Sequence, residues 1–198
     1  MNIVLATRNK KKIEEIRRIT AGMQINLFTL DDFPDCPEVE EDGKTFEENA
    51  LKKARAISEF TKMPALADDS GLEVYVLNNA PGVFSARYAG ESSGDAANTK
   101  KLLDDMLSAP DGRRGARFVC VIALSFPDGR SETFSGYCGG SIGREPGGSN
   151  GFGYDPVFYP EGYDRTFAEM ADSEKDALSH RGEALKKLSE YLQIKSRR

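Results

Sequence analysis

The sequence predicts an α/β protein built as a single domain over residues 1–198. Short apolar runs typical of buried strands alternate along the chain with segments whose apolar residues recur at helical spacing. The chain has 198 residues, of which 39% are hydrophobic and 30% charged, close to the composition of an ordinary globular domain. This length favours one domain, and no segment resembles a linker long enough to divide the chain.

The N-terminal third is expected to contain two strands and two helices. Their order is a strand at residues 2–6, a helix at 10–20, a strand at 25–30 and a helix that begins near residue 45. The first helix is indicated by Ile13, Ile16 and Ile19, whose spacing places them on one face. The second begins with TFEE (Thr45–Glu48), in which a hydroxyl precedes a glutamate by three residues, as in a capping box. A loop rich in acids and prolines lies between the second strand and this helix.

The rest of the chain continues the alternation. The expected elements are extended segments at 64–68 and 71–77, a helix at 95–107, a hairpin of strands 116–126 and 131–142, a glycine-rich loop at 143–156, and one or two helices from residue 173. The turn PDGR joins the two hairpin strands. In the last helix, Leu185, Leu188 and Leu192 are expected on the buried face.

Composition excludes several classes of function. The net charge is −5 without a long basic tract, which argues against a broad nucleic-acid surface, since such binding needs many Lys and Arg contacts to phosphates. The three cysteines are odd in number and far apart, unlike a zinc site or a disulfide framework. No apolar run reaches the roughly 18 residues of a membrane span, and the first residues lack the pattern of a signal peptide. We therefore expect a cytoplasmic protein that binds neither membrane nor nucleic acid.

The segment TRNKKK (Thr7–Lys12) follows directly on the first predicted strand. If Asn9 caps the helix, three lysines occupy its first turn, where the helix dipole disfavours cations. Free backbone N–H groups and lysines together suit a phosphate group. Three solvated lysines that happen to begin a helix are an equally good interpretation of this segment alone. The chain has neither a P-loop nor a GxGxxG sequence.

Two adjacent aspartates, Asp68 and Asp69, end an apolar run in the sequence ALADDSGLEV. Successive side chains of a strand point to opposite faces, so one should face a cleft while hydrogen bonds within the fold hold the other. Mg²⁺ takes one or two carboxylates and completes its shell with water and phosphate oxygens. Further acids come from EVEED (Glu38–Asp42) and EEN (Glu47–Asn49). A solvated acidic turn is the alternative, but for this pair we favour a functional site.

The glycine-rich loop places Phe152 and Tyr154 next to Asp155. Glycines allow the backbone to approach a ligand closely, and an aromatic ring offers a base a stacking surface. The alternative is a loop whose aromatic residues only contribute to the core. Close to the C-terminus, the only histidine, His180, precedes Arg181. A lone histidine is usually structural, although a cation here could bind the O6 acceptor of a purine.

Six motifs in this order resemble the inosine triphosphate pyrophosphatase family. They are LATRNKKK, TFEENALKKA, ADDSGLEV, PGVFSARYAG, GGSNGFGYDPVF and EKDALSHRG, and the match runs from about Ile3 to Leu192. The resemblance implies an elongated α/β fold with a central mixed sheet, flanking helices and two lobes around a cleft, usually as a homodimer. It also implies Mg²⁺-dependent hydrolysis of dITP, ITP and XTP to the nucleoside monophosphate and pyrophosphate, which keeps these nucleotides out of DNA and RNA.

The resemblance also assigns roles to residues. Glu40 and Asp69 would hold the metal, Asp69 would accept a proton from water, and Asp68 would support it from the other side of the strand. The expected substrate-binding residues are Thr7, Arg8, Asn9, Lys10, Lys11 and Lys12 for the triphosphate, Lys53 in a secondary phosphate role, Ser70, and for the nucleoside Phe152, Gly153, Tyr154, Asp155, Lys175, His180 and Arg181. The chain departs from the family pattern at Lys11, where glycine is common, and at Asn150, where a small residue is commoner.

Two other interpretations remain open at this point. A pyrophosphatase of the Maf-like kind would prefer modified pyrimidine nucleotides, but its features are missing and the sequence SHR argues against it. A nucleotide-sensing module without hydrolysis would leave the acidic residues unexplained. The sequence also leaves open how guanine is rejected while xanthine is accepted, because donors to O6 exclude only adenine.

Overall fold

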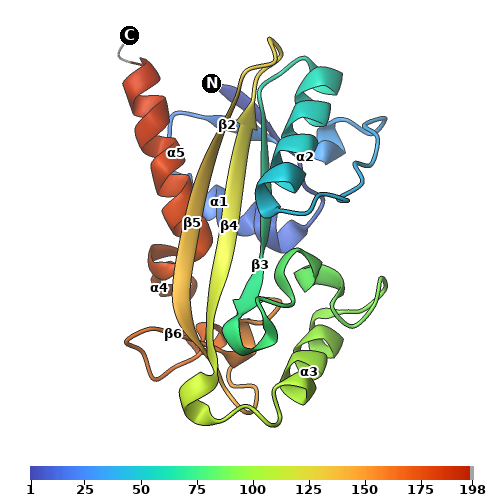
Figure 1. Cartoon of the computed structure of the whole chain (residues 1–198). Coiled ribbons are helices and arrows are strands. Elements are labelled where there is room, and N and C mark those ends of the chain that lie inside the picture. The colour runs from blue at the N-terminus through green and yellow to red at the C-terminus, as the bar shows by residue number, and fades with distance from the viewer. Residues whose placement is uncertain (197–198) are drawn as a thin grey trace. The chain divides into compact units, whose positions relative to one another are not determined.

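Residues 1–196 are described by a computed structural model (Figure 1). Its helices and strands are β1 (Asn2–Leu5), α1 (Lys10–Ile19), β2 (Asn26–Phe28), α2 (Phe46–Thr61), β3 (Ala65–Val74), α3 (Asp95–Asp105), β4 (Gly115–Ser125), β5 (Ser131–Ile142), β6 (Phe158–Pro160), α4 (Asp172–Leu178) and α5 (His180–Ser196). The strands form a six-stranded sheet in the order β2-β1-β3-β4-β5-β6. Because β1 is parallel to β2 and β3 while β5 and β6 are antiparallel, the sheet is mixed. The predicted α/β class is confirmed.

The described chain divides into two compact units, each made of several segments. Unit 1 contains Met1–Asp69, Cys120–Gly136 and the chain from Arg181 onward, and unit 2 contains Ser70–Val119 and Tyr137–His180. The three long strands β3, β4 and β5 each begin in one unit and end in the other. The single domain over residues 1–198 and the cleft between two lobes stay predictions.

In unit 1, helices cover both faces of the sheet. Residues of α1 and α5 form one apolar cluster with alternate residues of β1, β3 and β4, namely Ile16, Ala184, Leu185 and Leu188 with Ile3, Leu5, Leu66, Cys120, Ile122 and Leu124. Helix α2 buries Phe46, Ala50, Ala54 and Ile57, which do not belong to this cluster, and it contacts β1. Since neighbouring residues of a strand point to opposite faces, α2 lies on the face opposite to α1 and α5.

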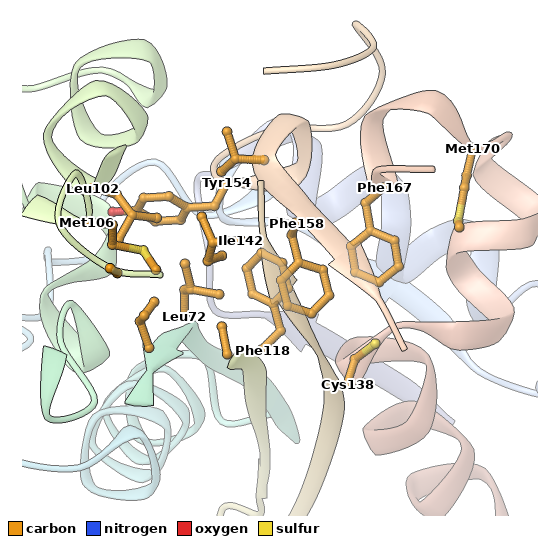
Figure 2. Close-up of a cluster of buried hydrophobic side chains, with 14 residues drawn as sticks. Leu72, Leu102, Met106, Phe118, Cys138, Ile142, Tyr154, Phe158, Phe167 and Met170 are labelled. Atoms are coloured by element: carbon orange, nitrogen blue, oxygen red, sulfur yellow. The ribbon is translucent and has the colours of Figure 1, made fainter. Parts of the chain in front are cut away.

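Unit 2 has its own aromatic core (Figure 2). The ring of Phe118 lies 4.6 Å from that of Phe158 and 6.0 Å from that of Phe167, measured between centroids. The buried guanidinium of Arg114 donates to the carbonyl oxygens of Ile142, Met106 and Gly143 at 2.7–2.9 Å. A backbone cage of this kind supplies the acceptors that a buried cation needs, so Arg114 ties the end of α3 to the end of β5.

The predicted elements are found with three differences. Residues 75–77, predicted to be extended, form a single 3₁₀ turn after the end of β3. The two extended segments predicted around the aspartate pair form one continuous strand, β3, and the short strand β6 was not predicted. Asn9 and Thr45 cap α1 and α2 as expected. The three cysteines are free and buried. Across residues 1–196, every helix is too short or too polar to cross a membrane.

Candidate active site

The start of α1 presents main-chain and lysine donors. The Asn9 side chain accepts a hydrogen bond from the backbone N–H of Lys12 at 3.2 Å, and the Thr7 hydroxyl accepts one from the N–H of Asn9 at 3.2 Å. Lys10 and Lys11 are exposed, whereas Lys12 is half-buried. A carboxylate is absent from the first turn of this helix, so the dipole and the lysines leave a strongly positive end.

Strand β3 directs its two aspartates to opposite faces, as the alternation of a strand requires. Asp68 lies toward α1 and α5, where Lys12 and Arg181 contact it. Asp69 lies toward α2, where Asn49 and Lys53 contact it. Both carboxylates are nearly inaccessible, with exposed fractions of 1% for Asp68 and 7% for Asp69. The two adjacent acids therefore occupy different electrostatic environments.

Asp68 belongs to a buried cluster of four charged groups. Its Oδ2 accepts from Arg181 Nη2 at 2.9 Å and lies 3.1 Å from Lys12 Nζ. The same guanidinium donates through Nη1 to Glu15 of α1, which is 5% exposed. Burial raises the pKa of Asp68, but Lys12, Arg181 and Lys53 outweigh it and hold that pKa far below its usual range. Asp68 is thus a permanent anion that fixes Lys12 and Arg181 in place.

Asp69 is surrounded by residues of α2 and of the acidic loop before it. Its Oδ2 accepts from Asn49 Nδ2 at 3.1 Å, and its Oδ1 lies 3.7 Å from Lys53 Nζ. Lys53 Nζ also donates to Glu41 at 2.9 Å and to the Asp68 carbonyl oxygen at 2.8 Å. Burial raises the pKa of Asp69 to about 6, against the lowering effect of Lys53 and Lys12 and with a smaller contribution from the Glu41 charge. At neutral pH this carboxylate is ionised yet basic enough to accept a proton.

Asn49 links Asp69 to the acidic loop through Gly43. The Gly43 N–H donates to Asn49 Oδ1 at 2.8 Å, so the carboxamide has its NH₂ group left for Asp69. A Cβ at Gly43 would lie 2.5 Å from Asn49 Oδ1 and 2.9 Å from the Glu48 Cβ. The loop can therefore approach α2 this closely only because residue 43 is glycine.

Gly43→Ala is expected to destabilise the protein by about 1–3 kcal/mol, because the added methyl group overpacks this contact and displaces Asn49. Gly22→Ala is the matched control, since nothing lies within 4 Å of a Cβ at that position. Urea unfolding followed by circular dichroism measures both. Equal stability of the two variants would show that the contact between Gly43 and Asn49 is not needed.

Asp69 and Glu41 can bind a divalent cation only when a substrate supplies further oxygen ligands. Within residues 1–196, no three His, Cys, Asp or Glu side chains are grouped as a metal site. Mg²⁺ needs only one or two carboxylates when phosphate oxygens and water complete its shell. The Lys53 ammonium lies between the carboxylates of Glu41 and Asp69. These two carboxylates therefore already bind one positively charged group. Glu40, the predicted metal ligand, is exposed, and its role stays a prediction.

Unit 2 holds a second cluster, around Asp155 of the glycine-rich loop. Asp155 Oδ2 accepts from Lys175 Nζ at 2.6 Å and from the Phe152 N–H at 2.8 Å. Lys175 Nζ lies 4.9 Å from the centroid of the Phe152 ring, within the range of a cation–π interaction. Asp155 and Lys175 are almost fully buried, whereas Phe152 is half-buried. The Phe152 ring therefore lies next to the Lys175 ammonium group, which Asp155 holds in place.

The loop needs glycine at two places but tolerates Asn150. Gly151 has φ +73°, and a Cβ there would lie 2.1 Å from Asp155 Oδ2; Gly148 has φ +80° and lies against Ala168. Asn150 is not in the left-handed region, and its side chain donates to the Met170 carbonyl at 3.0 Å. This departure from the family pattern therefore adds an anchor to the loop.

The predicted site residues fall into these two units. Unit 1 contains Thr7, Arg8, Asn9, Lys10, Lys11, Lys12, Glu40, Lys53, Asp69 and Arg181, and unit 2 contains Ser70, Phe152, Gly153, Tyr154, Asp155, Lys175 and His180. Within unit 1 the structure brings Lys12, Lys53 and Arg181 around Asp68 and Asp69. Arg8 instead donates to the Cys36 carbonyl at 3.4 Å. His180 is buried, with its ring stacked on Phe118 at 4.7 Å between centroids.

Glu15 was not considered from the sequence, and Glu41 and Asn49 were considered only as members of the segments EVEED and EEN, without an individual role. Asn49 could have been found, because Asn49 and Lys53 are four residues apart on the helix face that also carries apolar residues. Glu15 follows Lys12 by three residues on α1 and could have been paired with it. Neither spacing would have identified Arg181 or Asp69 as the partner.

Known proteins resemble the whole chain. The family model described as the Ham1 family matches residues 3–191. A dITP/XTP pyrophosphatase of Geobacter sulfurreducens is 53% identical over 96% of both chains, and one of Streptomyces coelicolor is 50% identical over 94% of both. The structure of a HAM1 protein from Coxiella burnetii superimposes with a TM-score of 0.90 at 45% identity, over 98% of this chain and 99% of that one. A nucleoside-triphosphatase / dITP/XTP pyrophosphatase from Mycobacterium abscessus gives a TM-score of 0.78 at 49% identity, over 95% and 98%.

Proposed function

This chain belongs to the Ham1 family, and on that premise we propose that it hydrolyses dITP, ITP and XTP to the nucleoside monophosphate and pyrophosphate. Its relatives of about 50% identity are named dITP/XTP pyrophosphatases, which are nucleoside-triphosphate pyrophosphatases, the enzyme class that the sequence predicted.

The environment of Asp69 is the observation that carries the proposal. This carboxylate is buried, its pKa is raised to about 6, and the ammonium group of Lys53 lies 3.7 Å away. Asp68, one residue earlier, is instead locked in an ion pair with Arg181. A buried carboxylate whose pKa lies near neutrality beside cations matches a general base that acts on water next to a polyanionic substrate.

The proposed reaction is attack of a water oxygen on the α-phosphorus. Asp69 accepts a proton from this water, the bond between the α-phosphorus and its bridging oxygen breaks, and pyrophosphate leaves with the electron pair. Hydrolysis of this kind depends on positioning and charge neutralisation more than on covalent chemistry. Lys12 and Lys53 supply positive charge from unit 1, and the N-terminus of α1 supplies backbone donors. A bound Mg²⁺, held by Asp69 with Glu40 or Glu41, would neutralise further charge on the phosphates.

For the nucleoside we propose the segment Phe152–Asp155 with Lys175. Phe152 offers a half-buried ring for stacking, and Lys175 is a buried donor held by Asp155. A donor directed at O6 of the base would favour hypoxanthine and xanthine over adenine, because a 6-amino group would leave it without an acceptor. Ser70, His180 and Arg181 complete the proposed substrate site.

The proposed role follows from the substrates. Removal of dITP, ITP and XTP from the nucleotide pool prevents their incorporation into DNA and RNA. We propose that the protein acts in the cytoplasm as a homodimer, with neither membrane nor nucleic acid as a partner.

The test is a product assay with purified protein, Mg²⁺ and separate dITP, XTP, dGTP, dATP or dTTP. We expect pyrophosphate from dITP and XTP, little turnover of dGTP and dATP, and loss of activity when EDTA replaces Mg²⁺. Orthophosphate as the first product would overturn the attack at the α-phosphorus. Pyrophosphate from dTTP alone would favour the Maf-like interpretation, and tight binding without turnover would indicate a nucleotide sensor.

A further inference from the structure

Helix α3 holds both main-chain polar groups of Gly153. The Gly153 N–H donates to Asp95 Oδ2 at 2.9 Å, and the Thr99 hydroxyl donates to the Gly153 carbonyl oxygen at 3.2 Å. Asp95 and Thr99 are four residues apart and therefore lie on the same face of α3. We call these two hydrogen bonds the Gly153 clamp. Neither Asp95 nor Thr99 belongs to the substrate-binding residues proposed above.

Gly153 separates two aromatic residues whose surroundings differ. Tyr154 is buried, and its hydroxyl donates to the Ser85 carbonyl at 2.8 Å. Phe152 is half-buried, with the Lys175 ammonium 4.9 Å from its ring centroid. Gly153 itself has φ +62°, in the left-handed region. Gly153 thus joins the buried Tyr154 to Phe152, whose own main chain is hydrogen-bonded to Asp155.

The other anchors of the loop hold different residues. The backbone N–H groups of Ser149 and Asn150 donate to the Ala168 carbonyl oxygen at 3.1 and 3.0 Å. The Asp155 carboxylate accepts a hydrogen bond from Lys175. The Phe152 N–H donates to Asp155 Oδ2 at 2.8 Å, and the clamp adds hydrogen bonds at Gly153, the residue that joins Phe152 to Tyr154. Thr99 is buried whereas Asp95 is exposed, so one half of the clamp is shielded from water and the other is not.

We propose that Asp95 and Thr99 are positioning residues for the nucleobase: they hold Gly153 so that the Phe152 ring is fixed before substrate binds. The inference rests on the proposed function, in which Phe152 stacks on the base. A ring that is already fixed loses less conformational freedom on binding, which strengthens binding without adding a contact. Asp95 and Thr99 lie in unit 2, whereas Asp69, Lys12 and Lys53 lie in unit 1. Loss of the clamp should therefore affect KM more than kcat.

Steady-state kinetics with dITP provide the first test. In Asp95→Ala and Thr99→Val, we expect KM to rise by about 3- to 10-fold each, the loss that corresponds to one hydrogen bond, with kcat within about twofold. The control is Asp104→Ala, which makes the same chemical change on the same helix but removes an exposed ion pair with Lys100. Its KM and kcat should match those of the unchanged protein. Because Asp95 also lies in the first turn of α3, thermal unfolding of each variant must be compared with this control.

A spectroscopic measurement tests the clamp without turnover. The chain contains no tryptophan, so Phe152→Trp introduces a single tryptophan, which can be excited selectively over the tyrosines, at the ring whose position is in question. We expect the fluorescence anisotropy of this tryptophan to fall when Asp95→Ala or Thr99→Val is added, and to stay unchanged when Asp104→Ala is added. A structural role of Asp95 confined to α3 would lower the melting temperature without changing this anisotropy.

The outcomes separate this inference from the proposed function. If the protein releases pyrophosphate from dITP but Asp95→Ala and Thr99→Val both keep its KM and the anisotropy is unchanged, the clamp inference is wrong and the function stands. The same conclusion holds if Asp104→Ala raises KM as much as Asp95→Ala. If the unchanged protein does not hydrolyse dITP, the function fails and the nucleobase role fails with it. The anisotropy then shows only whether α3 orders the loop.

Discussion

Asp69→Asn is expected to lower the rate of pyrophosphate release from dITP by at least about 10²–10⁴-fold, the usual contribution of a general base. Asparagine has nearly the same shape, but it cannot accept the proton of the attacking water. It also removes a carboxylate proposed to bind the metal, which would increase the loss. Single-turnover assays at saturating dITP and Mg²⁺ measure the chemical step directly. Near-normal turnover would show that Asp69 is not the base.

The same substitution should stabilise the metal-free protein at neutral pH. Burial raises the pKa of Asp69 from its ordinary value of 3.8 to about 6. Between these values the folded protein binds a proton that the unfolded chain has released, so Asp69 lowers stability as pH rises through this window. Asparagine does not titrate, and Asp69→Asn should therefore be more stable at pH 7.5 by about 1–3 kcal/mol.

Urea unfolding in EDTA, at several pH values from 4 to 8, measures this gain. The stability difference between Asp69→Asn and the unchanged protein should grow with pH and level off above about pH 6.5. Asp128→Asn, at an exposed aspartate of the hairpin turn that pairs with Arg130, serves as the control. A difference that is independent of pH would mean that the pKa of Asp69 is not raised.

Arg181→Met is expected to destabilise the protein by about 3–5 kcal/mol, because it leaves buried anions without their shared partner. Arg181 is 1% exposed and donates to both Glu15 and Asp68. Methionine fills a similar volume, so the loss reports on charge more than on packing. Denaturant unfolding at pH 7.5 gives the value.

Three further variants test whether the loss of stability in Arg181→Met comes from the buried charges. Arg181→Lys keeps the charge but loses the planar fork that reaches two carboxylates, so its loss should be intermediate. Glu15→Gln should restore part of the stability in the Arg181→Met background, since one buried anion is then removed. Arg130→Met breaks an exposed pair with Asp128 and should cost less than about 1 kcal/mol. An equally small loss in Arg181→Met would show that the buried cluster is not needed for stability.

Local patterns in the sequence predicted most of the fold. The α/β class, the caps at Asn9 and Thr45 and the hairpin joined by PDGR all depend on residues close together in the chain. Strand β6 has only three residues and forms by pairing with β5, so it lacks a periodicity of its own. The two segments predicted around the aspartate pair form one strand, which is hydrogen-bonded between β1 and β4, two strands that are distant from it in the sequence.

The alternation rule predicted that Asp68 and Asp69 would face different ways, but it could not identify their partners. Arg181 reaches Asp68 across 113 residues of sequence, and Asn49 reaches Asp69 across 20. A one-dimensional pattern does not contain such contacts. The clamp between α3 and Gly153 is another case, since its residues are 58 and 54 positions apart.

The arrangement of unit 1 also has a consequence for the order of biosynthesis. Asp68 leaves the ribosome long before Arg181, the guanidinium that it binds in the folded protein. Unit 1 also lacks its α5 layer, with Ala184, Leu185 and Leu188, until the last part of the chain has been made. Folding of this unit therefore has to wait for the end of translation. A chain released before residue 181 is made would expose an apolar sheet face, and Asp68 would lack its arginine partner. The quality-control machinery of the cell would meet such a chain in a partly unfolded state.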